Sequence, residues 1–394
     1  MKKNIFLLAM ILCPLFSFAQ EFRAAAENGD AEAQTKMGNH HFEKKEYTQA
    51  LEWYRKAEAQ GNAEAMIQIA ECYENGYGVT KDEKKGVEYE KKAAALGNAK
   101  AQCWLGNTYH NGYGGEQQDY AKAVEWYRKA AEQGNADAQN CLGVRYYLGE
   151  GVTKDYAKAV EWYTKAAEQG HATAQNNLGN CYYNGNGVTQ DYAKAVEWYR
   201  KAAEQGNANA QNNLGNCYNS GEGVTQDYAQ AAEWYRKAAE QGNKWAQFFL
   251  GDCYYHGKGV TKDYAKAVEW FTKAAEQGDA TAYYVLGICY KNGEGVTQDY
   301  TKAIDCFIKS NNEEPSTSFF IGDCYEKMKK YTKALEWYKK GDANGSGECS
   351  YSIGFMYYKG MGVQKDLSKA REYAKKAEER GYSLAKQLLN SIGR

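Results

Sequence analysis

Apolar side chains recur along this chain at helical spacing, in two patterns that alternate. In the first pattern Ala174, Leu178 and Tyr182 stand four residues apart, which predicts a helix over about 172–183. In the second, alanines and aromatic residues form an apolar stripe that predicts another helix over about 192–205. We name these two elements the A helix and the B helix.

Glycine and polar residues separate the two helices. The stretch NGNGVTQD, residues 184–191, breaks the helical pattern, and the carboxylate of Asp191 can cap the helix that follows. Gly206 comes directly after the B helix and supplies the left-handed turn with which many helices end. Each unit is therefore predicted to be a helix–turn–helix hairpin.

The sequence of this hairpin recurs many times along the chain. The segment DYAKAVEWYRKAAEQGNA occurs at 119–136 and again, unchanged, at 191–208, and most units are 36 residues long. One hairpin alone has no partner for its apolar face, whereas stacked neighbours bury it, so we expect a solenoid without a single globular core over 20–394. Ten units begin near residues 29, 61, 97, 134, 170, 206, 242, 278, 313 and 345, and a C-terminal cap helix is expected over 381–394.

A glycine recurs inside the A helix, at Gly179 and its equivalents, whereas the second unit has Ala70 there. Glycine within a helix is less favourable than alanine by about 0.5–1 kcal/mol. We therefore expect a large side chain to press on the backbone at this point, and the Trp198–Tyr199 pair of the B helix is its predicted source. The tryptophans equivalent to Trp198 are expected to pack in the core; they are Trp53, Trp126, Trp162, Trp234, Trp270 and Trp337.

Two short motifs resemble the tetratricopeptide pattern. They are Leu-Gly-x-x-Tyr in the A helix and Ala-x-x-x-Tyr in the B helix, at Leu178, Gly179, Tyr182, Ala195 and Tyr199. The 36-residue period, the Gly-x-Gly-Val loop and the closing Ala-Ala-x-x-Gly resemble its Sel-one-like repeat branch more closely. The resemblance implies an all-α fold, an α/α right-handed superhelical solenoid of about ten helix–turn–helix repeats. It also implies an adaptor or scaffold protein.

The first twenty residues, MKKNIFLLAMILCPLFSFAQ, differ from everything after them. Lys2 and Lys3 precede an apolar stretch that ends in small residues. This pattern is typical of a bacterial secretory signal peptide over 1–19, cleaved near Ala19–Gln20. We therefore expect a periplasmic or secreted protein whose mature chain contains no transmembrane segment.

Charge and motifs exclude several classes of function. The chain carries 49 basic and 50 acidic residues, a net charge of -1, which argues against a nucleic-acid partner. It has no HExxH motif, no nucleophile elbow, no phosphate-binding loop and no CxxC pair. We expect no catalytic residue, no cofactor and no metal.

Six of the cysteines share one position in the A helix: Cys72, Cys181, Cys217, Cys253, Cys289 and Cys324. Equivalent positions of stacked helices are about 8–10 Å apart, whereas a disulfide needs Cα atoms within about 7 Å. We expect these thiols to be buried as small apolar groups. An oxidising compartment leaves a disulfide framework open as the alternative, with Cys289 and Cys306 as one candidate pair.

Asparagine and tyrosine side chains are predicted to lie on the side of the A helix opposite Leu178. We call them the A-face residues: Asn107, Asn140, Tyr147, Asn176, Asn180, Tyr183, Asn212, Asn216, Asp252 and Tyr255. In tetratricopeptide-like solenoids this side is concave, and an amide offers both donors and an acceptor to a peptide backbone. We take the set as a hypothetical partner-binding site, with Trp104 and Trp245 as further exposed candidates. The alternative is that these are polar residues copied along with the repeat.

The sequence thus predicts a non-catalytic protein–protein interaction scaffold or adaptor in the cell envelope or outside the cell. Its concave A-helix face would bind an extended peptide or protein. Two alternatives stay open. A peptidoglycan- or glycan-binding envelope protein would also use amides and aromatic rings. A β-lactam or cell-wall peptide hydrolase follows only from a cysteine-rich subgroup of the resembling family, whose repeat-stapling cysteine pairs this chain does not reproduce.

Overall fold

The computed structural model describes residues 22–311 and 315–393. The expected signal peptide over 1–19 and the unit start near Glu313 lie outside the described residues. The chain divides into two compact units, one up to residue 202 and one from residue 203, and the division falls inside helix α11. Each unit is described by itself.

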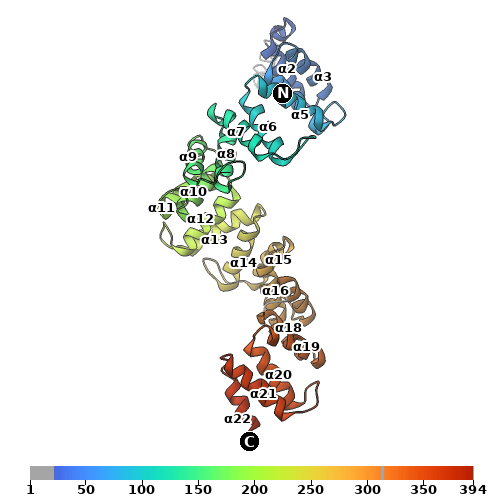
Figure 1. The fold of residues 1–394 in the computed structure, drawn as a ribbon, viewed down its shortest axis with the longest axis vertical. Helices are drawn as coiled ribbons and strands as arrows, with labels where there is room; N and C mark the ends of the chain where they lie inside the picture. The colour runs from blue at the N-terminus through green and yellow to red at the C-terminus, as the bar shows by residue number, and fades with distance from the viewer. Residues whose placement is uncertain (1–21, 312–314, 394) are drawn as a thin grey trace, which may run out of the picture. The chain divides into compact units, whose positions relative to one another are not determined.

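Every regular element in the described ranges is an α-helix (Figure 1). The first unit contains α2 (Ala31–Glu43), α3 (Tyr47–Glu58), α4 (Ala63–Asn75), α5 (Glu83–Ala95), α6 (Ala99–Asn111), α7 (Tyr120–Glu132), α8 (Ala136–Leu148), α9 (Tyr156–Glu168), α10 (Ala172–Asn184) and most of α11 (Tyr192–Glu204). The second contains α12 (Ala208–Ser220), α13 (Tyr228–Glu240), α14 (Lys244–His256), α15 (Tyr264–Glu276), α16 (Ala280–Asn292), α17 (Tyr300–Asn311), α18 (Pro315–Lys327), α19 (Tyr331–Ala343), α20 (Gly347–Lys359), α21 (Leu367–Glu379) and α22 (Ala385–Ile392).

The helices form the predicted hairpins. Even-numbered helices from α2 to α20 are A helices, and odd-numbered helices from α3 to α21 are B helices. Within each unit, an A helix packs against its own B helix, and that B helix packs against the next A helix in the chain. The helix within the range expected for the C-terminal cap is α22, which packs against α21 and α20.

Local chemistry sets the helix ends as the sequence predicts. The Asp191 carboxylate accepts a hydrogen bond from the Lys194 backbone N–H at 3.0 Å, which caps α11. At the other end of the hairpin, Gly206 has φ +90°, the left-handed conformation that glycine adopts without steric cost. The predicted helices over 172–183 and 192–205 are confirmed to within one residue at each end.

In eight hairpins of the described ranges the glycine of the A helix lies under an aromatic ring of the B helix, whereas in the last hairpin Ala374 takes the place of the ring. A Cβ atom at Gly143 would lie 2.6 Å from Cδ1 of Tyr163, and one at Gly215 would lie 2.7 Å from Cδ1 of Tyr235. These separations are far below van der Waals contact, so only glycine lets the ring lie flat on the helix backbone. The prediction of a pressing aromatic side chain is confirmed, and the tyrosine of the Trp–Tyr pair is the residue that presses.

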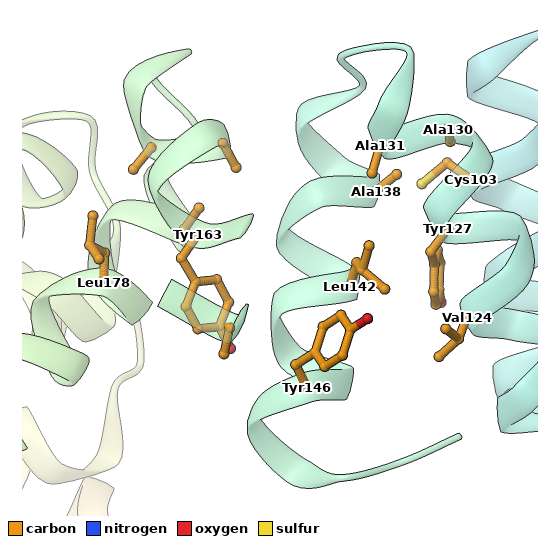
Figure 2. Packing of buried hydrophobic residues seen from close by; sticks show 14 of the residues in the cluster. Cys103, Val124, Tyr127, Ala130, Ala131, Ala138, Leu142, Tyr146, Tyr163 and Leu178 are labelled. Atoms are coloured by element: carbon orange, nitrogen blue, oxygen red, sulfur yellow. The ribbon is translucent and has the colours of Figure 1, made fainter. Parts of the chain in front are cut away.

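The tryptophans of that pair lie at the edge of the core. All seven are half-buried, and most of them pack against the core clusters, so the expected core packing is confirmed in part. Each has the ammonium group of the lysine three residues later over its ring, at 3.9 Å for Trp126 and 4.0 Å for Trp198. The tryptophans therefore shield the core from solvent, whereas the tyrosines fill it. Figure 2 shows Leu142 and Tyr146 of α8 pointing towards the buried Tyr127 and Val124 of α7.

A glutamine bridge ties several hairpins to the ones before them. The buried Gln139 of α8 donates to the Ala131 carbonyl at the end of α7 at 3.1 Å, and it accepts from Gln169 at the end of α9 at 2.7 Å. One side chain thus joins three helices, and its amide adds a second hydrogen bond to the Ala131 carbonyl, which already accepts one from the Gly134 N–H at 3.0 Å. The same bridge recurs around Gln34, Gln102, Gln211 and Gln247.

The six column cysteines are buried, as predicted. Burial raises the pKa of the Cys181 thiol to about 12, so this group is a neutral thiol at physiological pH. It therefore packs as a small apolar side chain. No helix in the described part of the chain is long and apolar enough to span a bilayer.

Replacing Gly143 with alanine is expected to destabilise the protein. Alanine favours a helix over glycine by up to about 1 kcal/mol, but the new methyl group would collide with the Tyr163 ring, and overpacking of this kind costs about 1–3 kcal/mol. A lower melting temperature by circular dichroism is the expected result. The same substitution in a Tyr163→Ala background should cost less. An unchanged or higher melting temperature would show that the ring moves aside freely.

Candidate functional site

Three of the A-face asparagines are tied to the core. In their hairpins the buried tyrosine that lies on the glycine directs its hydroxyl to the asparagine that follows that glycine. Tyr127 donates to Asn107 Oδ1 at 2.7 Å, Tyr199 to Asn180 Oδ1 at 2.7 Å, and Tyr235 to Asn216 Oδ1 at 2.8 Å. Each of these amide oxygens therefore satisfies a hydroxyl group at the edge of the core.

The residue at this position changes in the two hairpins whose core ring is phenylalanine. Opposite Phe271 the chain has Asp252, and opposite Phe307 it has Ile288. Neither phenylalanine has a hydroxyl group to satisfy. Val144, opposite Tyr163, is an exception among the tyrosine hairpins. Packing therefore explains much of the asparagine pattern that sequence reasoning attributed to a partner.

Asn176 and Asn212 do not lie on an open face. Their side chains are buried, with 6% and 7% of their surface exposed. The expected placement on an open face opposite the core is wrong for these two residues. They are equivalent to each other and lie directly after the bridging glutamines Gln175 and Gln211.

The remaining A-face residues are half-buried and have neighbours across the repeat. Asn140 Oδ1 accepts a hydrogen bond from Asn177 at 3.1 Å. The Tyr147 hydroxyl accepts one from Asn186 at 2.9 Å. In the second unit, the Tyr255 hydroxyl donates to Glu294 at 2.6 Å, and Asp252 pairs with His256 at 3.2 Å. Tyr183 packs edge-on against Tyr192, with ring centroids 5.1 Å apart.

One hollow brings several of these groups together within the first unit. It encloses about 210 Å³ between α8, α9 and α10. Tyr147 and Asn180 line it, as do Tyr163 and Asn177. Its rim carries Leu148, which is 52% exposed although it is large and apolar. The hollow therefore offers a ring, an amide and an apolar contact at one place.

The two tryptophans outside the B-helix column differ from each other. Trp245 is 53% exposed, as expected for a surface contact. Trp104 is half-buried and lines a second hollow of the first unit, between α4, α5 and α6. This second hollow encloses about 390 Å³.

The second hollow exists because the second hairpin departs from the repeat at three positions. Glu90 stands where eight of the other hairpins have the core ring, Ala70 replaces the glycine beneath it, and Gly86 replaces an alanine. Ala70 fits because no ring presses on it, and a Cβ atom at Gly86 would lie 2.6 Å from Cγ of Glu74. Loss of the ring opened space, and the glycine made room for a second carboxyl side chain.

Glu90 is a buried acid. Only 3% of its surface is exposed, and its Oε2 atom accepts a hydrogen bond from Thr108 Oγ1 at 2.7 Å. Burial, with a contribution from the nearby Glu74 carboxyl, raises the pKa of Glu90 to about 8. Burial also raises the pKa of Glu74. At neutral pH one proton therefore stays on this pair of carboxyl groups.

Sequence reasoning noted Ala70 but missed Glu90. The signal was available, because a charged residue interrupts a column of core aromatics. In the described residues no group of three or more histidine, cysteine or acidic side chains is arranged to hold a metal ion.

Comparison with known protein families identifies the family of these repeats. The Sel1 repeat model matches nine segments, residues 31–62, 63–98, 99–135, 136–171, 172–207, 208–243, 246–279, 280–313 and 347–382. The chain belongs to the Sel1 repeat family. A tetratricopeptide repeat model matches residues 315–342 of this Sel1 repeat protein. The family and the all-α repeat fold predicted from the sequence are thereby confirmed.

Solved structures of other Sel1 repeat proteins are similar. The chain is 39% identical to c5321, described as a protective antigen present in uropathogenic Escherichia coli strains that displays an SLR fold, over 95% of this chain and 82% of that one, with a TM-score of 0.80. A Sel1 repeat protein from Oxalobacter formigenes is 36% identical over 61% of this chain and 96% of that one, with a TM-score of 0.58.

A short match links the Sel1 repeats to a curated eukaryotic protein. The ERAD-associated E3 ubiquitin-protein ligase component HRD3 of Candida glabrata is 42% identical over 52 residues, which is 13% of this chain and 6% of that protein. Together these relationships identify a repeat scaffold of the kind typical of protein–protein interaction.

Replacing Asn216 with alanine is expected to lower stability even if no partner is present. The Tyr235 hydroxyl would lose its acceptor, and an unsatisfied buried polar group costs about 1–3 kcal/mol. Thermal unfolding should show a lower melting temperature for Asn216→Ala. Adding Tyr235→Phe should restore part of the lost melting temperature, because Phe271 already fits the equivalent position. Equal melting temperatures for Asn216→Ala and the wild type would contradict a structural role for this amide.

The Glu90 carboxyl is expected to make stability depend on pH. Its pKa in the folded protein is raised to about 8, so its favourable contribution is present at acidic pH and is lost as the pH rises towards 8. Glu90→Gln, which keeps the shape, should leave the melting temperature at pH 5 nearly unchanged. At pH 8.5 the variant should be more stable than the wild type by on the order of 2–4 kcal/mol. Parallel pH profiles for the two proteins would contradict a buried acid.

Proposed function

We propose that this Sel1 repeat protein is a non-catalytic adaptor that binds an extended segment of another protein on the surface of its A helices. The main observation in support of this proposal is the hollow between α8, α9 and α10. It combines the exposed Leu148 with the Tyr147 ring and the Asn180 amide. Apolar and aromatic groups supply contact area, and amides hydrogen-bond a peptide backbone, which is the composition of many recognition surfaces.

The proposal includes the cell envelope or the exterior as the place of action. Its support is the N-terminal sequence, in which Lys2 and Lys3 precede an apolar stretch and small residues near Ala19. The repeat family itself is compatible with protein partners in many compartments, so localisation needs its own measurement. A fluorescent fusion or fractionation of the source cells would supply it.

Partner capture tests the proposed surface. The bait is the mature chain from Gln20, and the variant is Leu148→Lys, which places a charge at the rim of the hollow without touching the core. The matched control is Leu96→Lys, because Leu96 is 57% exposed but lies outside this hollow. We expect an envelope protein to be retained by the wild type and by Leu96→Lys and to be reduced at least about tenfold with Leu148→Lys, a loss of roughly 1.4 kcal/mol.

Other results of the same capture would change the assignment. Equal retention by all three baits would place the partner elsewhere on the repeats. Recovery of cell-wall fragments in place of protein would favour the glycan-binding alternative. Hydrolysis of a β-lactam by the purified wild-type chain would overturn the non-catalytic assignment.

A further inference from the structure

The hollow beside Glu90 differs in charge from the rest of the A-helix surface. Three carboxyl groups line it, those of Glu71 and Glu74 from α4 and of Glu90 from α5. No lysine, arginine or histidine lines it. Its volume of about 390 Å³ lies within the range of small-ligand sites, which is about 300–1,000 Å³. A cavity of one sign of charge favours a ligand of the opposite sign.

The carboxyl pair in this hollow lacks hydrogen-bond donors. Thr108 donates to the Oε2 atom of Glu90, and the proton that the pair holds joins the carboxyl groups of Glu90 and Glu74. Glu74 Oε1 is buried and has no hydrogen-bond partner among the described residues. Buried polar atoms without partners cost free energy, so this pair requires either a proton or an external donor. The missing partner is a group that carries both hydrogen-bond donors and positive charge.

The other residues that line the hollow can contact an aliphatic stem and a peptide backbone. The Trp104 ring lines it from α6 and offers a flat apolar surface to an aliphatic stem. Asn107 and Asn111, also from α6, bring amide groups that can contact a peptide backbone. Tyr113 lines the hollow from the loop that follows α6.

We propose that the hollow between α4, α5 and α6 binds the side chain of a lysine in the partner peptide, with its ammonium group between Glu74 and Glu90 and its aliphatic stem along Trp104. This inference rests on the proposed function, because it assigns a specificity pocket to the same A-helix surface. The ammonium group has three donors, and the oxygens of the pair need donors. An arginine fits less well, because Thr108 already occupies one Glu90 oxygen and a two-pronged guanidinium contact needs both oxygens.

Binding of the ammonium group displaces the proton that the pair holds. The charged and titratable groups around the pair are Glu71 on α4, Glu83 on α5, Lys81 before α5, and Tyr113. Lys81 is already paired with Glu83 at 2.7 Å, so it does not neutralise the hollow. Because the pKa of Glu90 is raised to about 8, a proton is released on binding at pH 7, and affinity increases as the pH rises from 6.5 to 8.5. The lysine ammonium stays charged over this range.

Titration calorimetry with capped peptides tests the proposal on the mature chain. The probes are Ala-Ala-Lys-Ala-Ala and the same peptide with norleucine, which keeps the stem and removes the charge. The lysine peptide is expected to bind at least about tenfold more tightly than the norleucine peptide. Its binding heat at pH 7 should differ between phosphate and Tris, since a released proton is taken up by the buffer.

Two variants locate the effect. Glu90→Gln should lower the affinity for the lysine peptide about tenfold and abolish the dependence on buffer. Glu88→Gln is the matched control, because Glu88 is exposed on the same helix and does not line the hollow, and its affinity should equal that of the wild type. The comparison of lysine with norleucine on the wild-type chain stands even if a variant folds poorly.

Three results would overturn the proposal. Equal binding of the lysine and norleucine peptides would show that the hollow does not recognise the charge of the ligand. If capture of a protein still depends on Leu148, the proposed function would stand without this pocket. Binding of n-butylamine as tight as that of the lysine peptide would show a site for free amines. Absence of any lysine-peptide binding would refute the pocket, and the Leu148 capture would then decide separately whether the A-helix surface binds protein.

Discussion

Contact between a tyrosine ring and the bare backbone of a glycine determines how close the two helices of each hairpin lie. A side chain of any size at Gly143 or Gly215 would push the helices apart. The ring gives the hairpin its buried area, and its position brings the hydroxyl group to the outer edge of the A helix. In several hairpins the residue there accepts a hydrogen bond from this hydroxyl group, as Asn107, Asn180 and Asn216 do. Surface composition in these repeats is thus partly a consequence of core packing.

The second hairpin shows what happens when that contact is absent. Glu90 replaces the ring, Ala70 no longer has to be glycine, and the space is lined by acids and by Trp104. The bridging glutamine is absent from the same hairpin, where Met66 and Leu96 occupy the two glutamine positions. The ring, the glycine beneath it and the bridging glutamine, which recur in several other hairpins, are all replaced here. Such joint departures distinguish a specialised repeat from one that has merely drifted.

Much of the fold was predictable because its determinants are local. The four-residue spacing around Leu178, the Asp191 cap and the Gly206 turn act within one hairpin, and they set helix ends to within a residue. Even the ring over the glycine followed from helix propensity. The candidate site was less predictable, because exposure depends on the neighbouring repeat. Asn176 and Asn212 are buried, and the seven column tryptophans lie at the edge of the core beside their lysines. The Glu90 hollow needed three positions, distant in sequence, to be considered together.

Within each unit, helices pack chiefly against their neighbours in the sequence. Few contacts therefore hold one end of a unit to a distant part of it, and a pull on the chain reaches one hairpin at a time. Under tension such an array lengthens in discrete steps, since each hairpin yields by losing its own contacts, which include the ring contact and the glutamine bridge in the hairpins that have them. The hairpins next to the yielding one keep their packing. The opened hairpin can pack again when the load is removed. A scaffold of this kind is extensible, and it can remain attached to a partner while the surfaces that it connects move apart.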